Sequence, residues 1–259
     1  MRNLALIKLG GSVVTFKDRP LTANIEAIDG ISQALLRVDI PMVIVHGGGS
    51  FGHYRSVQYD MHTNPAKYDA HGVSVVHESM IALNQLVVNS MIRFGLNPYG
   101  LQPSVFWSAH RPVVAKIKNL FSMAGSNVLP VTFGDVVQVE GSKYSILSGD
   151  SLMTIIAKIL RPSRVVFATN VDGIYRDLGS RKLIQELRAR EAGKSIKVLA
   201  NPVADVTGGM QRKITEAFKI ASHGMDVMLV NGLYPGRIVD AAEGKPTIGS
   251  LIRKSRGRS

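Results

Sequence analysis

The hydrophobic positions of this chain fall into short apolar runs that alternate with longer segments of helical periodicity. Each short run is almost wholly apolar, which is typical of a strand buried on both faces of a parallel sheet. These runs predict strands at residues 4–9, 42–46, 128–133, 164–169 and 226–231. The periodic segments predict helices at residues 22–38, 72–94, 151–160 and 210–223.

This alternation predicts an α/β fold: a three-layer αβα sandwich around an open, mainly parallel central sheet. Residues 135–148 instead alternate in polarity around Glu140, Gly141 and Ser142, which predicts an inserted β-hairpin. No repeat or change in composition marks an independent unit. We therefore expect a single domain, 1–259, with an N-terminal lobe at about 1–160 and a C-terminal lobe at about 161–252, divided near Pro162.

Composition and charge exclude some classes of protein and leave others open. The chain is 45% hydrophobic and has no cysteine, so a sizeable core is expected, whereas disulfides and thiolate metal sites are excluded. No apolar run approaches the roughly 20 residues of a membrane helix. The net charge of +12 includes four basic residues in a tail at 253–259, which we expect to be frayed and solvated. A basic surplus attracts polyanions, so nucleic acid, anionic membranes and phosphorylated substrates all remain candidates.

Three glycine-rich turns stand where predicted strands end and helices begin. They are Gly10-Gly11-Ser12, Gly47-Gly48-Gly49-Ser50-Phe51-Gly52 and Thr207-Gly208-Gly209. Backbone N–H groups at the start of a helix bind anions, and open α/β sheets bind ligands at the carboxyl ends of their strands. Three such turns predict a ligand with more than one phosphate group, although any single turn can be glycine-rich only because it is tight.

The central turn also matches two common nucleotide-binding patterns incompletely. Gly47, Gly49 and Gly52 have the dinucleotide spacing, but no second strand ending in an acidic residue follows. Gly47 and Gly52 could begin a P-loop, but His53 and Tyr54 occupy the positions of the lysine and of the magnesium-binding hydroxyl. The sequence therefore supports neither a dinucleotide-binding fold nor a P-loop protein.

Four cationic or protonatable side chains recur beside these turns: Lys8, Lys17, His53 and Lys213. Lys8 is the most informative, because a lysine inside an apolar strand is unfavourable unless its ammonium group meets an anion. The alternative is that Lys8 reaches the strand end or pairs with a buried carboxylate.

Together these residues resemble the amino-acid kinase superfamily over essentially the whole chain. The resemblance rests on Lys8-x-Gly10-Gly11-Ser12, Gly47-Gly48-Gly49, Asp172-Gly173-Ile174-Tyr175 and Asp205-Val206-Thr207-Gly208-Gly209-Met210-x-x-Lys213. Within that superfamily, the octapeptide from His46 to His53 and the later Ser148-Gly149-Asp150 resemble the isopentenyl phosphate kinase branch. A fosfomycin kinase branch shares much of the pattern.

The resemblance implies roles for individual residues. Lys8, Lys17, His53, Asp150 and Lys213 would be catalytic, with Lys17 bridging donor and acceptor and Asp150 orienting the lysines. ATP would be bound by Gly10, Gly11, Ser12, Asp172, Gly173, Tyr175, Gly208 and Gly209. The acceptor phosphate would be bound by Gly47, Gly48, Gly49, His53 and Gly149. Phe16, Ser151 and Asn170 depart from the common pattern at positions where an acidic residue is frequent.

The tail of the acceptor should meet an apolar surface. Only Glu78 and Arg93 are formally charged in the predicted helix 72–94. Val73, Val76, Met80 and Leu83 follow helical spacing on it, which favours an apolar acceptor pocket. The alternative is a helix that is apolar because it packs in the core or against a second subunit.

The function that the resemblance implies is ATP-dependent phosphorylation of isopentenyl phosphate to isopentenyl diphosphate in isoprenoid biosynthesis, by the alternative mevalonate route. It also implies Mg²⁺ with the ATP, no protein-based metal site, a homodimer and a cytoplasmic location away from membranes. A kinase for another small phosphate or phosphonate, such as fosfomycin, is the alternative of the same fold. Nucleic-acid binding has only the basic charge in its favour, and no recognised nucleic-acid motif accompanies it.

Overall fold

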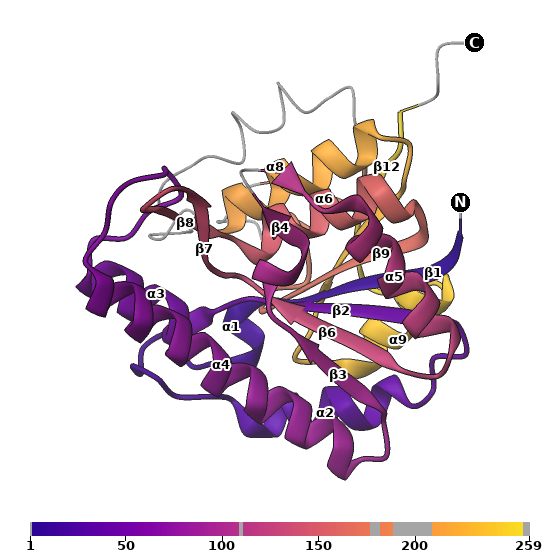
Figure 1. Ribbon diagram of the computed structural model, residues 1–259. Coiled ribbons are helices and arrows are strands. Elements are labelled where there is room, and N and C mark those ends of the chain that lie inside the picture. Colours follow the sequence, from indigo (N-terminus) through magenta and orange to yellow (C-terminus); the bar gives the residue numbers. More distant parts are fainter. Residues whose placement is uncertain (1, 109–110, 177–181, 189–208, 256–259) are drawn as a thin grey trace.

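Eight strands form one open sheet in the order β10-β12-β11-β9-β1-β2-β6-β3. All neighbours are parallel except β11 and β12. This computed structural model describes residues 2–108, 111–176, 182–188 and 209–255 (Figure 1). The bounds of the sheet strands are β1 Arg2–Leu9, β2 Met42–His46, β3 Pro98–Leu101, β6 Leu129–Phe133, β9 Pro162–Thr169, β10 Glu186–Arg188, β11 Val227–Asn231 and β12 Gly249–Arg253.

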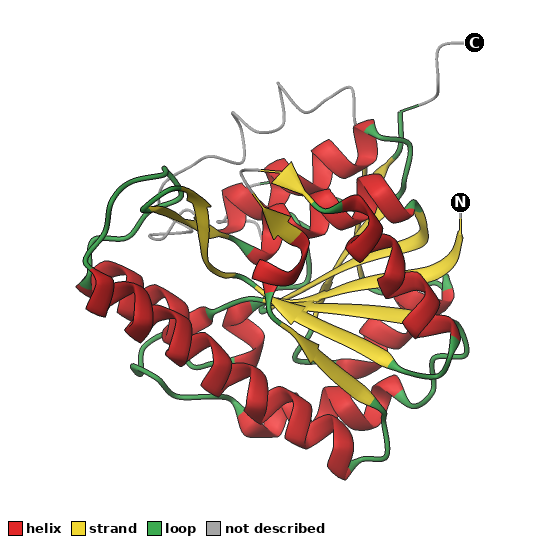
Figure 2. Ribbon diagram, viewed as in Figure 1, coloured by secondary structure: helices red, strands yellow, loops and turns green. Residues whose placement is uncertain are grey.

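Helices cover both faces of this sheet, as the yellow strands between red helices in Figure 2 show. The helix bounds are α1 Gly11–Val14, α2 Ile25–Leu35, α3 Gly49–Gln58, α4 Ala70–Arg93, α5 Val114–Gly125, α6 Gly149–Leu160, α8 Gly209–Ser222 and α9 Pro235–Glu243. A short 3-10 helix, η1 (Pro103–Phe106), leads into the two-residue strands β4 (Trp107–Ser108) and β5 (Arg111–Pro112). None of the described helices is long and apolar enough to cross a membrane.

The alternation of side chains along β1 creates two separate cores. Leu4 and Leu6 pack on the face covered by α5, α6 and α8. Ala5, Ile7 and Leu9 pack on the opposite face, against α1, α2, α4 and α9. Because a central strand is buried on both faces, its whole run is apolar. The predicted three-layer αβα sandwich with a mainly parallel sheet is therefore confirmed.

The predicted hairpin at residues 135–148 is also confirmed. Strands β7 (Asp135–Glu140) and β8 (Lys143–Leu147) pair antiparallel and lie outside the main sheet. Gly141 makes the turn between them with a positive φ of 52°, a conformation that glycine adopts without strain. The hairpin stands over α3 and α4 on the left of Figure 1.

The register aligns the carboxyl ends of the central strands. Leu9 at the end of β1 pairs with His46 of β2 and with Ala168 of β9, and His46 pairs with Phe133 of β6. The turns that follow these strands consequently lie along one edge of the sheet, where open α/β sheets place their ligands.

The basic tail is shorter than the sequence suggests. Arg253 ends β12, and its guanidinium lies 3.0 Å from a carboxylate oxygen of Glu186 and 3.4 Å from one of Asp226. The expectation of a frayed end is therefore wrong for Arg253, because two acidic side chains on neighbouring segments pair with it. Residues 256–259 lie outside the described part of the chain.

Candidate active site

Two of the predicted glycine turns meet at this edge of the sheet. A Cβ atom on Gly11 would lie 2.3 Å from the amide nitrogen of Gly49, so only glycine permits the turns to approach so closely. Thr15 fastens them together, because its hydroxyl donates to the Gly11 carbonyl and accepts from the Ser50 amide, 2.7 and 2.9 Å away. Gly47 to Gly49 thus lead into α3 directly beside the start of α1.

A buried ion-paired cluster lies next to the turns. The Lys8 ammonium lies 2.7 Å from Oδ1 of Asp150, and the Lys213 ammonium lies 3.6 Å from the same oxygen. Lys8 comes from β1, Asp150 from the first turn of α6 and Lys213 from α8. The side chain of Lys8 is 3% exposed and that of Lys213 is 12% exposed. Two cations from distant parts of the sequence therefore meet over one carboxylate.

The cluster shifts the ionisation of its members. Burial lowers the pKa of Lys8 to about 8, although Asp150 opposes that shift, and Lys213 adds to it. For Asp150, burial disfavours the charged form, but the nearby Lys8 and Lys213 outweigh burial and lower its pKa. Asp150 is therefore ionised at neutral pH, and it balances only part of the positive charge around it. The remaining positive charge attracts an anion.

The start of α6 positions this carboxylate. Ser148 caps the helix, since its hydroxyl accepts from the Ser151 amide at 3.1 Å. The Ser151 hydroxyl lies 2.9 Å from that of Ser148, so Ser151 takes part in the cap. A Cβ atom on Gly149 would lie 2.9 Å from the Lys8 ammonium nitrogen. Glycine at this position leaves room for Lys8 to reach Asp150.

Two of the predicted catalytic residues do not belong to the ion-paired cluster. His53 is exposed and lies in α3, four residues after Gly49. Lys17 is exposed in the segment that follows α1. Their predicted roles toward the acceptor and the donor remain predictions.

The predicted nucleotide residues form a second group at the end of β9. Asp172 accepts hydrogen bonds from Asn231 at 3.1 Å and from Arg237 at 2.6 Å. Hydrogen bonds from Asn231, Arg237 and Tyr175 lower the pKa of Asp172. The hydroxyl of Ser250 lies 2.5 Å from where a Cβ of Gly173 would stand. Gly209 begins α8, whereas Gly208 lies outside the described residues.

The four apolar residues predicted to face the acceptor fall into two groups. Met80 and Leu83 belong to the large core beneath the sheet, where they are 1% and 0% exposed. Val76 belongs instead to a small separate cluster between α4 and the hairpin, and Val73 packs against that cluster. One apolar helix therefore serves both the core and a second apolar region.

Sequence reasoning assigned no role to two histidines of the site region. His46 is fully buried between the Gly47 carbonyl and Asn84, and burial lowers its pKa to about 4, so it is neutral. On α4, His77 places Nδ1 2.6 Å from Oδ2 of Asp135. That hydrogen bond raises the pKa of His77, whereas burial raises the pKa of Asp135 against the opposing effect of His77. His46 begins the octapeptide at residues 46–53, whereas His77 belongs to no motif, so only its position in the fold singles it out.

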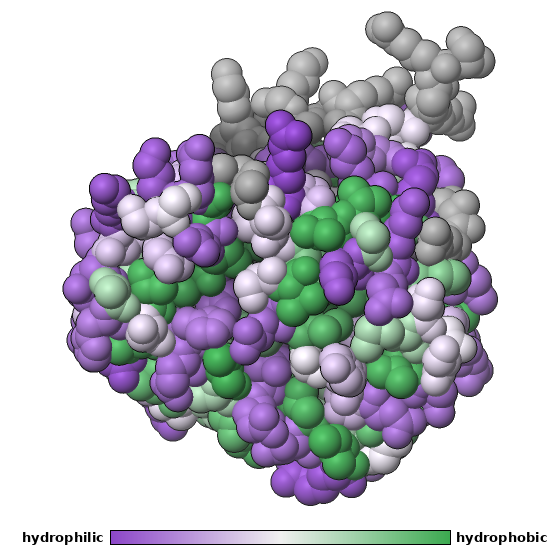
Figure 3. Space-filling model, in the orientation of Figure 1, coloured by the Kyte–Doolittle hydropathy of each residue, from purple (hydrophilic) through white to green (hydrophobic). Residues whose placement is uncertain are grey.

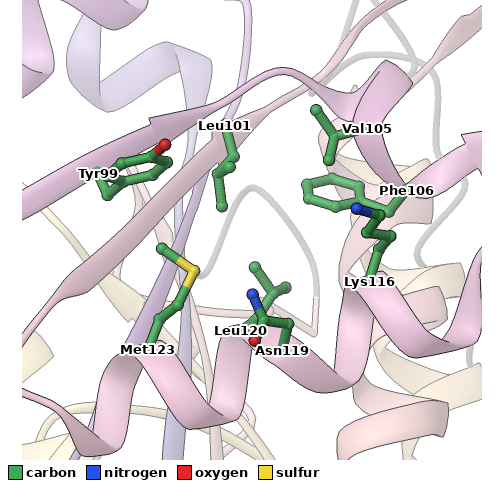
Figure 4. A pocket seen from close by; sticks show the side chains of 8 residues that line it. All are labelled: Tyr99, Leu101, Val105, Phe106, Lys116, Asn119, Leu120 and Met123. Carbon is green, nitrogen blue, oxygen red and sulfur yellow. The ribbon is translucent and has the colours of Figure 1, made fainter.

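Among the residues that the structure describes, no three His, Cys, Asp or Glu side chains are grouped to hold a metal ion. A pocket of about 320 Å³ lies elsewhere, between β3, η1 and α5 (Figure 4). It is lined by Tyr99, Leu101, Val105, Phe106, Lys116, Asn119, Leu120 and Met123, none of which is a predicted site residue. The ion-paired cluster is thus a separate feature of the molecule.

Comparison with known proteins gives full-length matches. The Amino acid kinase family profile matches residues 3–231. An isopentenyl phosphate kinase from Thermoplasma acidophilum is 32% identical over 96% of this chain and 100% of that protein. An isopentenyl phosphate kinase from Methanothermobacter thermautotrophicus is 30% identical over 96% of this chain and 98% of that protein. An acetylglutamate kinase from Staphylococcus epidermidis is 24% identical over 92% of this chain and 99% of that protein.

Solved structures agree with the sequence matches. The crystal structure of the T. acidophilum isopentenyl phosphate kinase product complex has a TM-score of 0.79 at 30% identity, and it covers 96% of this chain and 100% of that chain. A UMP kinase from Ureaplasma parvum has a TM-score of 0.63 at 19% identity over 98% of this chain and 100% of that chain, which shows a shared fold only.

Proposed function

The chain belongs to the amino acid kinase family, and from this premise we propose that it transfers the γ-phosphoryl group of ATP to isopentenyl phosphate. The products are isopentenyl diphosphate and ADP. The convergence of Lys8, Asp150 and Lys213 at the carboxyl ends of the strands carries the assignment of phosphoryl transfer. The full-length similarity to isopentenyl phosphate kinases supports the choice of acceptor.

The reaction needs charge compensation more than a base. A phosphate monoester has a second pKa near 6, so its oxygen is already an anionic nucleophile at neutral pH. That oxygen forms the new P–O bond while the bond from the γ-phosphorus to the bridging oxygen of ATP breaks, and the electron pair leaves with ADP. Two like charges about 4 Å apart repel by about 4 kcal/mol at an effective dielectric constant of 20. Lys8 and Lys213 offset this repulsion and stabilise the transferring group.

The two lobes divide the substrates between them in this proposal. Residues at about 161–252 hold the nucleotide, with Asp172, Gly173, Tyr175 and the start of α8 on that side. Residues at about 1–160 hold the acceptor, whose phosphate meets Gly47 to Gly49, Gly149 and His53. Gly10, Gly11 and Ser12 stand between the two, and Lys17 bridges donor and acceptor.

The apolar tail of the acceptor fits the small cluster between α4 and the hairpin. Met61, Val76 and Val136 are buried there, and the partly buried side chains packed against them are Tyr59, Tyr68, Val73, Tyr144 and Ile146. We name this group the tail cluster. Figure 3 shows hydrophobic surface in the region where the hairpin stands over α3 and α4. A branched five-carbon chain is apolar throughout, so such a surface suits it.

Magnesium enters this proposal with the nucleotide. Asp150 is already paired with two lysines, so the described residues do not form a protein cage for the ion. Mg²⁺ commonly keeps several waters and is held largely by substrate phosphates, where it neutralises part of their charge. A homodimer and a cytoplasmic location are further implications of the family resemblance, and sedimentation of the purified chain tests the first.

A coupled assay of ADP release tests the proposed acceptor. Isopentenyl phosphate, dimethylallyl phosphate, fosfomycin and acetylglutamate are supplied in parallel, with Lys8→Met as the control for contaminating kinases. We expect turnover with isopentenyl phosphate that the variant lacks. Turnover confined to fosfomycin would establish the alternative kinase, and turnover confined to acetylglutamate would refute the proposal. Deleting residues 256–259 separates nucleic-acid binding from catalysis, because phosphoryl transfer should survive while retention on a polyanion falls.

A further inference from the structure

One ion pair lies at the base of the tail cluster. Nδ1 of His77 on α4 lies 2.6 Å from Oδ2 of Asp135, the first residue of β7. The neighbours in sequence of these two residues are Val76 and Val136, which are both buried members of the tail cluster. The ion pair therefore joins the two backbones that carry opposite sides of this cluster.

Asp135 is buried and accepts a hydrogen bond at each carboxylate oxygen, whereas His77 is partly exposed. The side chain of Asp135 is 1% exposed, and its Oδ1 accepts from the Val136 amide at 2.7 Å. The side chain of His77 is 34% exposed. A buried carboxylate that loses its hydrogen-bond partner is unfavourable, so the bond between Asp135 and His77 holds α4 against the start of β7.

Asp135 is also connected to the phosphate end of the site through the backbone. The preceding residue, Gly134, donates its amide to the His46 carbonyl at 3.2 Å. A Cβ atom on Gly134 would lie 2.6 Å from the Gly149 amide nitrogen, and Gly149 itself adjoins Lys8. Through Gly134, the start of β7 therefore packs directly against the turn at Gly149 that adjoins Lys8.

We propose that His77 and Asp135 are positioning residues that fix the spacing between α4 and the hairpin, and thereby set acceptor affinity and the longest acceptor chain admitted. This inference rests on the proposed function. An apolar pocket discriminates by how closely its walls fit the ligand, and packed walls yield little. Without the ion pair the walls separate, so a five-carbon tail fits loosely and a longer tail gains entry.

The test uses His77→Ala and Asp135→Asn, with His77→Asn as the conservative variant because its amide can donate near the position of Nδ1. We measure kcat and KM for isopentenyl phosphate and geranyl phosphate at saturating ATP, and Tm for each protein. We expect His77→Ala and Asp135→Asn to raise the KM for isopentenyl phosphate about tenfold, the lower end of what an apolar pocket distinguishes, with kcat and the KM for ATP nearly unchanged. The ratio of kcat/KM for geranyl phosphate to that for isopentenyl phosphate should rise in both variants. His77→Asn should keep the KM for isopentenyl phosphate and this ratio close to those of the unaltered chain.

A matched control removes an ion pair at the other end of the same helix. Arg93 and Ser90 of α4 both donate to Oδ1 of Asp29 on α2. Asp29→Asn should lower Tm without changing the KM for isopentenyl phosphate or the chain-length ratio. The double variant of His77→Ala and Asp135→Asn should raise the KM for isopentenyl phosphate no more than the more affected single variant does, because the two residues act as one unit.

Three results separate the inference from the proposed function. Absence of turnover of isopentenyl phosphate by the unaltered chain would overturn both. Turnover by the unaltered chain, with variants that lose only Tm and keep both the KM and the ratio, would overturn the inference alone. A fall in kcat at unchanged KM would also overturn it, because it would place the pair with the reacting groups rather than with the tail.

Discussion

We propose that the candidate site has a phosphate end around Lys8, Asp150 and Lys213 and a tail end at the tail cluster. These two ends are built in different ways. At the phosphate end, side chains from β1, α6 and α8 meet in a buried cluster at the carboxyl ends of the central strands. At the tail end, the tail cluster lies between α4 and a hairpin that does not join the main sheet. All five side chains packed around its three buried members remain partly exposed.

This difference indicates where each property of the enzyme resides. Charged groups that must be positioned to within about an ångström benefit from the rigidity of a closely packed sheet. Chain-length selection needs only a wall at a suitable distance, and a hairpin outside the sheet can supply it without disturbing the strands. We therefore expect substitutions at the phosphate end to change kcat, and substitutions at the tail end to change the choice of acceptor.

The largest expected effect is loss of the two lysines. Lys8→Met and Lys213→Met should each lower kcat by about 10²- to 10³-fold, because in the proposed reaction each removes a cation that stabilises the transferring phosphoryl group. The double variant should lose much less than the product of the two single losses, since one lysine gains little without the other. Steady-state kinetics of the three variants checks this.

A control for the lysines comes from α6, the helix that carries Asp150. Lys158 lies in its last turn and is exposed, so Lys158→Met should leave kcat unchanged. If Lys8→Met and Lys213→Met keep full kcat and lose only thermal stability, the two lysines are structural. The expectation that substitutions at the phosphate end change kcat is then wrong.

His53 should come next in magnitude. We expect it to donate a hydrogen bond to the acceptor phosphate and not to act as a base, because the nucleophile is already ionised. His53→Ala should lower kcat/KM for isopentenyl phosphate by about 100-fold, whereas His53→Gln keeps a donor and should retain measurable turnover. Equal rates in His53→Ala and the unaltered chain would remove His53 from the phosphate end.

The pH dependence of nucleotide capture gives a sharper test of Lys8. Its pKa is lowered to about 8, chiefly by burial, so the free protein loses the Lys8 charge as the pH rises through 8. The value of kcat/KM for ATP should therefore fall above pH 8. The polyphosphate favours the charged ammonium, so the corresponding fall in kcat should occur at higher pH.

The effect of the same group on stability has the opposite sign. Between about 8 and the ordinary lysine value of 10.5, the unfolded chain binds the proton that the folded chain lacks. The Lys8 contribution to the free energy of unfolding therefore rises with pH across that window. A profile for kcat/KM that stays flat through pH 8 would show that Lys8 does not hold the nucleotide.

The sequence predicted the centre of the sheet better than its margins. The five predicted strands are β11, β9, β1, β2 and β6, which are neighbours in the sheet. The outer strands β3, β10 and β12 were missed. Tyr99 and Gly100 of β3 are exposed, so this strand has no continuous apolar run to mark it. A strand is visible in sequence to the extent that both its faces are buried.

The site shows a similar division. A lysine inside an apolar strand is conspicuous, so Lys8 predicted a partner of negative charge. The structure shows the alternative to an anionic ligand, a buried carboxylate, which is that of Asp150. His77 and Asp135 are separated by 58 residues and belong to no motif, so only the fold reveals their contact. Periodicity on the helix at residues 72–94 could not separate Val73 and Val76 from Met80 and Leu83, because both pairs lie on an apolar face.

The smallest expected effect is a change of acceptor preference. It tests whether Val73 and Val76 contact the acceptor while Met80 and Leu83 belong to the core. The Met80 sulfur lies 2.9 Å from where a Cβ of Gly48 or of Gly52 would stand, so Met80 packs beneath the phosphate-side turn. Met80→Ala and Leu83→Ala should therefore lower stability by about 2 to 5 kcal/mol, as buried residues of this size do, and leave the chain-length ratio unchanged.

Val73→Ala and Val76→Ala should instead act on the acceptor. Each removes two methyl groups from the tail cluster, so the ratio of kcat/KM for geranyl phosphate to that for isopentenyl phosphate should rise about tenfold, with the KM for ATP unchanged. Val73 is only partly buried, so its stability loss should be the smaller of the two. If Met80→Ala or Leu83→Ala shifts the ratio while Val73→Ala does not, the acceptor tail lies over the core side of α4. The tail cluster would then be a packing contact between the helix and the hairpin.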